Sequence, residues 1–285
     1  MAAAVRHGDI VRLRHGAYVD GDVFRGASTE MRHALLARAV LMQARTGVVL
    51  SHLSAVPEYG GPLWNVPLAE VHVTRLDRRA GRKEAGVRQH QGVLTGNDVV
   101  ELNGVTATSP ARTLIDVTTC THTEAALVIV NDLLHRRLTT ISDVRTRYST
   151  MQRHPFTLRT DLILRLADRR IESVGETRTY YVCWRQGLPA PEPQWVVHDS
   201  QGREFARLDF AWPEHKVWLE FDGREKYVKY VREGETVVDV VLREKRRESD
   251  IAELTGWRCI RVTWAELTDP ARLAARIAAV LRIAA

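Results

Sequence analysis

Three carboxylates in the C-terminal part of the chain have the types and spacing that metal-dependent hydrolysis requires. Asp209 and Glu220 lie in two successive segments with strand patterning, joined by a turn at residues 212–216. We expect these strands to be antiparallel neighbours whose carboxylates converge. Asp222 is two residues beyond Glu220 and shares its face of the strand, while the residue between them points into the core.

A fourth acid, Glu176, lies in a predicted helix before these strands. Carboxylate clusters suit Mg²⁺ or Mn²⁺, which activate water and offset the charge of a phosphate. The sequence therefore predicts metal ligands at Glu176, Asp209 and Glu220, with Lys226 close enough to hold the attacking water or a phosphate oxygen. Acids on adjacent strands are also commonly solvent-facing partners of Arg or Lys, and spacing alone leaves that alternative open.

The elements that position these acids follow the order α, β, β, β, α, β, α. This order predicts an α/β (α+β) fold, a mixed sheet flanked by helices. The expected helices are 172–186, 237–254 and 270–281, and the expected strands are 194–198, 205–212, 216–221 and 258–263. The long helix has a charged face on which Arg243, Arg247 and Asp250 are expected to support the acids or hold a phosphate. Its other face is expected to pack inward through Val240, Val241, Ile251 and Leu254.

The N-terminal half has a different pattern of elements. Residues 6–19 predict a β-hairpin, residues 29–45 a helix, residues 51–57 a short helix capped by Ser51, and residues 70–74 a strand. Helices are expected at 109–120, 123–134, 142–148 and 158–167. An interruption near residue 155 predicts two domains, 1–155 and 156–285.

Charge favours a polyanionic partner. The chain has 41 basic and 35 acidic residues, a net charge of +6, and a pI near 9.5. A dense basic run follows the strand at 70–74. Such a run is a solvated face in many proteins and a set of phosphate contacts in others. The predicted DNA contacts here are Arg75, Arg78, Arg79, Arg82 and Lys83.

Composition excludes several other classes. The 285 residues include three widely spaced cysteines, which predict buried free thiols rather than a disulfide framework or zinc site. Without an apolar span or signal core, we expect a cytoplasmic protein. Six histidines, at positions 52, 72, 90, 122, 135 and 154, follow no metal-ligand spacing and are interpreted as solvated or core residues. Motifs for ATP hydrolysis and esterase chemistry are absent.

The C-terminal motifs together carry a family resemblance. The runs Glu220–Gly223, Arg243–Asp250 and Gly256–Trp264 resemble the actinobacterial domain family related to the very-short-patch-repair endonucleases, and Gly175–Arg178 and Arg207–Pro213 fit the same pattern. That family belongs to the PD-(D/E)xK nuclease superfamily. The resemblance covers about residues 172–281 and implies a restriction-endonuclease-like fold.

The resemblance also implies roles for the acids. Asp209 would be the central metal ligand, Glu220 and Asp222 the acids of the third strand, and Glu176 the acid of the first helix. The superfamily motif is acid, any residue, lysine, whereas this chain has Asp222 in the third position. The lysine role would then pass to Lys226 or to the long helix.

The N-terminal half is similar to AbiEi-type antitoxins of type IV toxin–antitoxin systems. The similar segments are His52–Arg75 and Thr108–Asp116, and Arg12–Tyr18 resembles the wing of the family's winged helix. Arg12 and Arg14 are therefore expected to contact DNA. Only a partial winged helix is expected, because the sequence starts almost at the wing and leaves no room for a recognition helix before it.

These observations support two functions, with a third less favoured. The first is a Mg²⁺- or Mn²⁺-dependent endodeoxyribonuclease, a hydrolase in phage defence or DNA repair. The second is a DNA-binding antitoxin or transcriptional regulator, partnered by a toxin, whose nuclease fold is inactive. The third is an interaction protein that binds another protein through its C-terminal domain. The intact acids favour the first function, and Asp222 in the lysine position favours the second.

Overall fold

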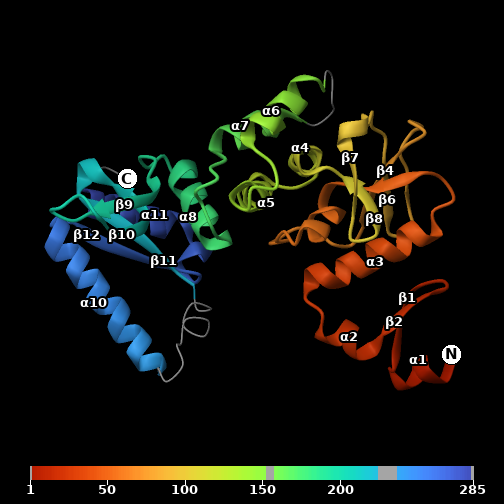
Figure 1. Ribbon diagram of the computed structural model, residues 1–285, viewed down its shortest axis with the longest axis horizontal. Coiled ribbons are helices and arrows are strands. Elements are labelled where there is room, and N and C mark those ends of the chain that lie inside the picture. The colour runs from red at the N-terminus through yellow and green to blue at the C-terminus, as the bar shows by residue number, and fades with distance from the viewer. Residues whose placement is uncertain (1, 152–156, 224–235, 284–285) are drawn as a thin grey trace. The chain divides into compact units, whose positions relative to one another are not determined.

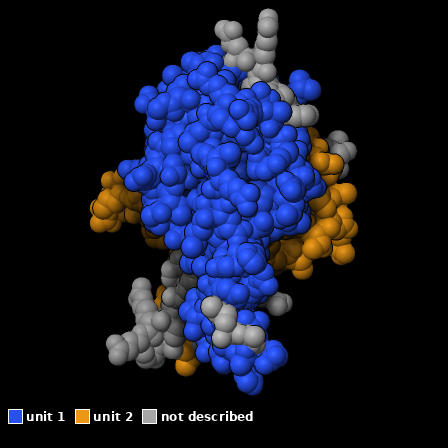
Figure 2. Space-filling view, turned by 90° about the vertical axis from the view of Figure 1, so that its right-hand side faces the viewer, with its two compact units in different colours: residues 1–169 blue, residues 170–285 orange. Residues whose placement is uncertain are grey.

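The computed structural model describes residues 2–151, 157–223 and 236–283 (Figure 1). The chain folds as two compact units, unit 1 over Met1–Arg169 and unit 2 over Arg170–Ala285 (Figure 2). The division lies later than the boundary predicted at 155/156. The reason is that α7 (Thr160–Leu166) packs against the helices α4 (Pro110–Cys120) and α5 (Thr123–His135) of unit 1.

Unit 2 has the predicted order of elements. Its helices are α8 (Val174–Arg185), α10 (Val237–Thr255) and α11 (Pro270–Leu281), and its strands are β9 (Glu192–His198), β10 (Glu204–Trp212), β11 (Val217–Asp222) and β12 (Arg258–Thr263). The strand order is β12-β11-β10-β9. Strand β10 runs antiparallel to both of its neighbours, β9 and β11, and β12 runs parallel to β11. A 3-10 turn, Pro213–His215, joins β10 to β11.

Helices cover both faces of the unit 2 sheet. One face carries Phe210, Leu219 and Phe221 and packs against Leu273 and Ile277 of α11. The opposite face has its own core, in which α10 contributes the buried Ile251. The unit is therefore an α/β three-layer structure, as the sequence predicts. The expected inward packing of Leu254 is wrong, because that side chain is 42% exposed near the end of α10.

The first part of unit 1 is a β-hairpin between short helices and a long helix. The hairpin, β1 (Ile10–Arg14) and β2 (Ala17–Asp20), confirms the prediction, with Gly16 at φ 73° in its turn. The flanking helices are α1 (Ala2–His7), α2 (Gly21–Gly26) and α3 (Thr29–Gln43). Ser28 caps α3 by accepting a hydrogen bond from the Met31 amide.

A six-stranded sheet forms the centre of unit 1. Its order is β5-β6-β4-β3-β8-β7. The sequence predicts just one of these strands, because alternation over two to five residues is too short a signal. The strands are β3 (Val48–Leu50), β4 (Val71–Arg75), β5 (Lys83–Glu84), β6 (Val87–His90), β7 (Val99–Leu102) and β8 (Val105–Thr108).

The two faces of this sheet differ in chemistry. Helix α3 packs Ala37 and Val40 on the face that carries Val71, Val73 and Val87. Since side chains alternate along a strand, His72 and His90 lie on the opposite face. The other helices are α4, α5, α7 and α6 (Ile141–Ser149), which confirm the predicted segments.

Two short 3-10 turns replace the helix predicted at 51–57. They are His52–Ser54 and Val56–Tyr59, and the Ser51 side chain caps neither. Instead, the Ser51 hydroxyl accepts a hydrogen bond from Thr74 Oγ1 at 2.8 Å. Among the helices of the described residues, none has the length and apolar character to cross a membrane. Cys120, Cys183 and Cys259 are free thiols.

Candidate functional site

Asp209 lies at the point where the buried side chains of β10 change from one face of the sheet to the other. Leu208 belongs to the core beside α10, whereas Phe210 belongs to the core on the other side. The register pairs Phe210 with Leu219, so one further step places Asp209 opposite Glu220. Asp209 Oδ2 accepts a hydrogen bond from the Phe221 amide at 2.8 Å. This bond anchors the carboxylate to β11 next to Glu220.

Glu176 is the third residue of α8 and has a structural role there. The Ser173 hydroxyl donates to its Oε1 at 2.6 Å, and the Glu172 amide donates to its Oε2 at 3.0 Å. This is a variant of the capping box, because the amide comes from the residue before the N-cap. Glu176 is 5% exposed. Burial first, and then the negative charge of Asp209, raise its pKa, so the two acids share one electrostatic environment.

Gln194 is a site residue that the sequence did not indicate. It lies within β9, yet its φ is +53°. The left-handed conformation costs a non-glycine residue about 1–2 kcal/mol. Its side-chain amide donates to Glu176 Oε2 at 3.3 Å. Backbone strain of this kind concentrates at functional sites, and a glutamine in a strand gives no sequence signal for it.

Glu220 is 8% exposed and contacts the long helix. Arg247 of α10 lies 3.6 Å from Glu220 Oε1 through its Nη2. The same nitrogen donates to the Arg207 carbonyl of β10 at 2.7 Å. Arg247 therefore lies beside one of the acids, where a residue that supports them is expected, whereas Asp250 is exposed.

The remaining residues predicted around this site differ in position. Asp222 is half-buried at the end of β11, and Arg243 is half-exposed on α10. Lys226 lies outside the described residues, and so do the side chains of Val240 and Val241. The structure thus brings Glu176, Asp209 and Glu220 together at the β10–β11 pair, with Arg247 as the adjacent cation.

The predicted DNA contacts of unit 1 fall into two groups. Arg75 is 8% exposed and is held by Asp77 Oδ1 and Gln89 Oε1, each at 2.8 Å, so its guanidinium is not offered to solvent. Arg14 is tied to Gln43 and the Ala85 carbonyl. The residues that are exposed are Arg12, Arg78, Arg79, Arg82 and Lys83.

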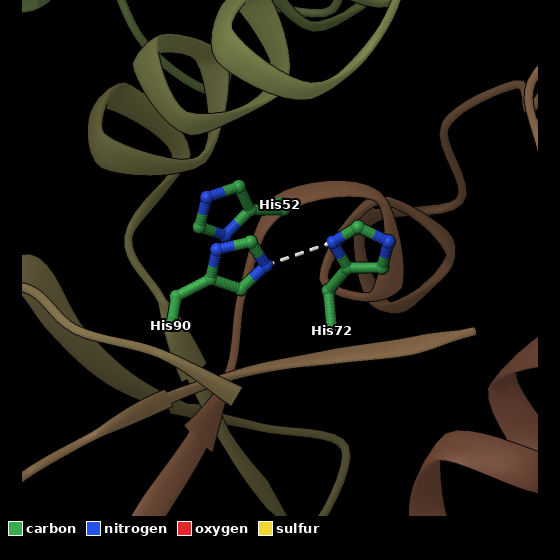
Figure 3. A group of neighbouring side chains, drawn as sticks. All are labelled: His52, His72 and His90. Atoms are coloured by element: carbon green, nitrogen blue, oxygen red, sulfur yellow. Dashed lines mark hydrogen bonds between the residues drawn. The ribbon is translucent and has the colours of Figure 1, made fainter. Parts of the chain in front are cut away.

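A histidine cluster in unit 1 brings together three histidines that follow no metal-ligand spacing in the sequence. Among the described residues, His52, His72 and His90 form a group whose ligand atoms all lie within 4.8 Å of one another (Figure 3). His72 Nδ1 and His90 Nε2 share a hydrogen bond of 3.0 Å. Burial first, and then the charge of Arg88, lower the pKa of His72 to about 4, so its imidazole is neutral near pH 7.

Comparison with known proteins gives relatives without an assigned activity. The chain is 27% identical over 275 residues to the uncharacterized protein MT2308 of Mycobacterium tuberculosis strain CDC 1551 / Oshkosh, covering 96% of this chain and 93% of that protein. The uncharacterized protein Rv2248 of strain H37Rv gives the same values. No family model matches the chain, and no solved structure matches it.

Proposed function

We propose that unit 2 is a metal-dependent endodeoxyribonuclease domain of the restriction-endonuclease-like type. The observation that carries this proposal is the grouping of Glu176, Asp209 and Glu220, with the Asp209 carboxylate tied to the Phe221 amide at 2.8 Å. A supporting point is the order of strands, in which three antiparallel strands precede a fourth that is parallel to the third.

The donor set fits a hard divalent cation. Mg²⁺ usually takes one or two carboxylates, several waters and the substrate phosphate, rather than a complete protein cage. Asp209 and Glu220, on neighbouring strands, would supply these carboxylates. A cation bound there supplies a water of lowered pKa and offsets phosphate charge.

The protein groups around the acids have distinct parts in this proposal. Glu176 has a raised pKa, and a raised pKa brings a carboxylate closer to the value at which it accepts a proton from water near neutral pH. Gln194 and Ser173 hold the Glu176 side chain in place. In this proposal, the strained backbone of Gln194 places its side-chain amide where it can donate to Glu176.

Arg247 would take the cationic role that the superfamily gives to lysine. Asp222 occupies the lysine position of the motif, and Arg247 reaches Glu220 from α10 at 3.6 Å. Guanidinium binds phosphate oxygens through two parallel hydrogen bonds, so Arg247 is suited to hold the scissile phosphate. Replacement by lysine would keep the charge and lose that bidentate geometry.

The test is cleavage of supercoiled plasmid and single-stranded DNA by the full chain in Mg²⁺, Mn²⁺ or EDTA. The variants are Asp209→Asn and Glu220→Gln, which preserve shape while removing one negative charge each. A matched control is Glu253→Gln, because Glu253 is an exposed acid of α10. DNA affinity measured in EDTA separates loss of chemistry from loss of binding.

We expect cleavage that requires metal and is lost in both site variants, with DNA affinity retained. A retained cleavage in Asp209→Asn contradicts the assignment. So does cleavage that is equally fast in EDTA.

A DNA-binding regulator or type IV antitoxin is the second candidate. The specific observations in its favour are Asp222 at the lysine position and the exposed cations Arg78, Arg79, Arg82 and Lys83 of unit 1. DNA binding with strong salt dependence and no cleavage under any metal would favour this function. In that case the acids of unit 2 serve the fold alone.

A further inference from the structure

We propose that His52, His72 and His90 of unit 1 bind a divalent transition-metal ion, with Zn²⁺ the best match, whose open coordination position faces a pocket for a phosphate-bearing ligand. This site is separate in chain position and donor chemistry from the carboxylates of unit 2. It does not depend on the nuclease proposal.

The sheet of unit 1 brings the three imidazoles together. Strands β4 and β6 are parallel neighbours, with His72 paired to Arg88 and Thr74 paired to His90. His72 and His90 therefore project from the same face, one diagonal step apart. His52 begins the 3-10 turn that follows β3, and its φ of +53° is a left-handed conformation that non-glycine residues rarely adopt.

The nitrogen separations are close to those of a metal site. Two nitrogens that each lie about 2.0–2.1 Å from a tetrahedral zinc are separated by roughly 3.3 Å. His72 Nδ1 and His90 Nε2 are 3.0 Å apart, so both could reach one ion after a movement of a few tenths of an ångström. His52 stacks on His90 with ring centroids 3.6 Å apart (Figure 3). Its ring would turn out of this stack to complete the set.

A buried carboxylate lies behind the cluster. Asp116 Oδ2 is 3.8 Å from His52 Nδ1, and its side chain is fully buried. In the described part of the chain, Oδ2 accepts no hydrogen bond, although Oδ1 accepts one from Arg112 at 2.8 Å. Metal-binding histidines commonly give their second ring nitrogen to a carboxylate, which fixes the ring. His52 Nδ1 shares a hydrogen bond with Ser51 Oγ at 2.9 Å, and Asp116 lies near enough to take this role for His52 when its ring turns.

A basic pocket opens beside the cluster. Its volume is about 860 Å³, and its lining includes His52 and His90 together with Arg88, Arg112 and Arg147. The described lining contains five Lys and Arg side chains and no carboxylate. Three imidazole ligands and one open position are the pattern of a catalytic rather than a structural zinc site. An anion that enters this pocket would meet the metal and the exposed guanidinium of Arg88, whereas Arg112 and Arg147 are already paired with Asp116 and Asp98.

A core of hydrogen-bonded histidines without metal is the alternative to this proposal. In that case the 3.0 Å contact is an ordinary imidazole pair and the pocket binds anions by charge alone. The two interpretations differ in measurable ways. If the histidines bind a metal, removing one of them lowers the affinity for that metal. If they form a metal-free core, the wild-type chain has no such affinity, and removing one of them lowers only the stability of unit 1.

The experiment uses the full chain, freed of metal with a chelator, in an Asp209→Asn background that weakens the unit 2 site. Titration calorimetry with Zn²⁺, the visible spectrum of bound Co²⁺ and the melting temperature with and without Zn²⁺ are the readouts. The variants are His72→Gln and His90→Gln. The matched control is His33→Gln, since His33 is a buried histidine of unit 1 outside the cluster.

We expect one Zn²⁺ per chain, a tetrahedral-type Co²⁺ spectrum and a Zn²⁺-dependent rise in melting temperature. His72→Gln and His90→Gln should lower Zn²⁺ affinity by on the order of 100-fold, and Asp116→Asn by about 10- to 100-fold. His33→Gln should retain the affinity. Equal Zn²⁺ affinity in the background chain and the two ligand variants would overturn the proposal. If His72→Gln fails to fold, the half-buried His90 decides the question.

Inorganic phosphate tests the ligand half of the proposal. Phosphate should bind the zinc-loaded chain at least about tenfold more tightly than the zinc-free chain, and Arg88→Ala should reduce that binding. Arg88 is exposed on the pocket wall, so its removal leaves the fold intact. Phosphate affinity that is independent of both zinc and Arg88 would refute a shared site.

Discussion

Asp98 is a buried carboxylate of unit 1 whose removal should strongly destabilise the unit. It is 1% exposed. Arg147 donates to it through Nε at 2.5 Å and Nη2 at 2.7 Å, and the Thr95 amide donates at 2.7 Å. Arg112 Nη1 lies 3.8 Å away. Asp98 is thus the carboxylate partner of Arg147 and joins α6 to the loop before β7, whereas Arg112 also pairs with Asp116 at 2.8 Å.

The expected cost of Asp98→Asn follows from these contacts. Removing one partner of a buried ion pair costs about 3–5 kcal/mol, because the other charge stays buried without compensation. For a unit that ends at Arg169, that cost corresponds to a fall of roughly 6–20 °C in melting temperature. Domains have only about 5–15 kcal/mol of stability, so the variant should fold but be marginal.

The pH dependence has a definite sign. Burial works to raise the pKa of Asp98, but hydrogen bonds from Arg147 and Thr95 outweigh it and hold the pKa below the usual value. The stabilisation is therefore complete above the unfolded pKa of about 3.9 and is lost as the pH falls through the lower folded value. Wild type and Asp98→Asn should converge in stability once the pH falls below the folded pKa of Asp98.

Urea unfolding of the full chain, followed by circular dichroism, measures this cost. Glu101→Gln is the control, because Glu101 is an exposed acid of the nearby strand β7. A loss of less than about 1 kcal/mol, the value typical of a surface pair, would show that Arg147 is not a buried charge that needs Asp98. The same result would show that the contacts of Asp98 do not determine its contribution to the free energy of unfolding.

Three further predictions concern unit 2 and the basic loop. Burial and the charge of Asp209 raise the pKa of Glu176, so ionising this carboxyl costs stability. Unit 2 should therefore lose stability as the pH rises above about 4.3, the pKa of an unfolded Glu. Urea unfolding of Glu176→Gln across the same pH range should not show that loss. Gly175→Ala should destabilise unit 2 by about 1–3 kcal/mol in the same assay, because its Cβ would overlap the Phe221 ring. The third prediction replaces four exposed cations by Ala, namely Arg78, Arg79, Arg82 and Lys83. If each of them contacts a phosphate, the slope of log DNA affinity against log salt concentration should become shallower by about 3–4. If they are only solvated, the slope should not change.

The sequence predicted unit 2 well because its signals are long. Strands of six to nine residues and a helix of 19 residues give periodicity that survives local exceptions. The pairing of Asp209 with the Glu220 strand followed from a short turn between them. The expectation for Leu254 was wrong because it is the residue next to the last of α10 and its side chain is 42% exposed.

Unit 1 was harder to predict for a physical reason. The histidines are separated by 20 and 18 positions, so no local spacing connects them. They meet because β4 and β6 pair in parallel, and β6 has just four residues. Arg75 likewise lies within a basic run, yet it is the last residue of a fully buried strand and pairs with Asp77. A run of charged residues does not show which of its members will be buried at the end of a strand.

The two proposed metal sites can be tested independently because their donors differ. Carboxylate oxygens favour Mg²⁺ and Mn²⁺, whereas imidazole nitrogens favour zinc and its neighbours. DNA cleavage that depends on Mg²⁺ should therefore persist in His72→Gln, and Zn²⁺ binding should persist in Asp209→Asn. If His72→Gln instead abolishes Mg²⁺-dependent cleavage while unit 2 remains folded, the histidines serve the nuclease reaction. The independence argued from their donor chemistry would then be wrong.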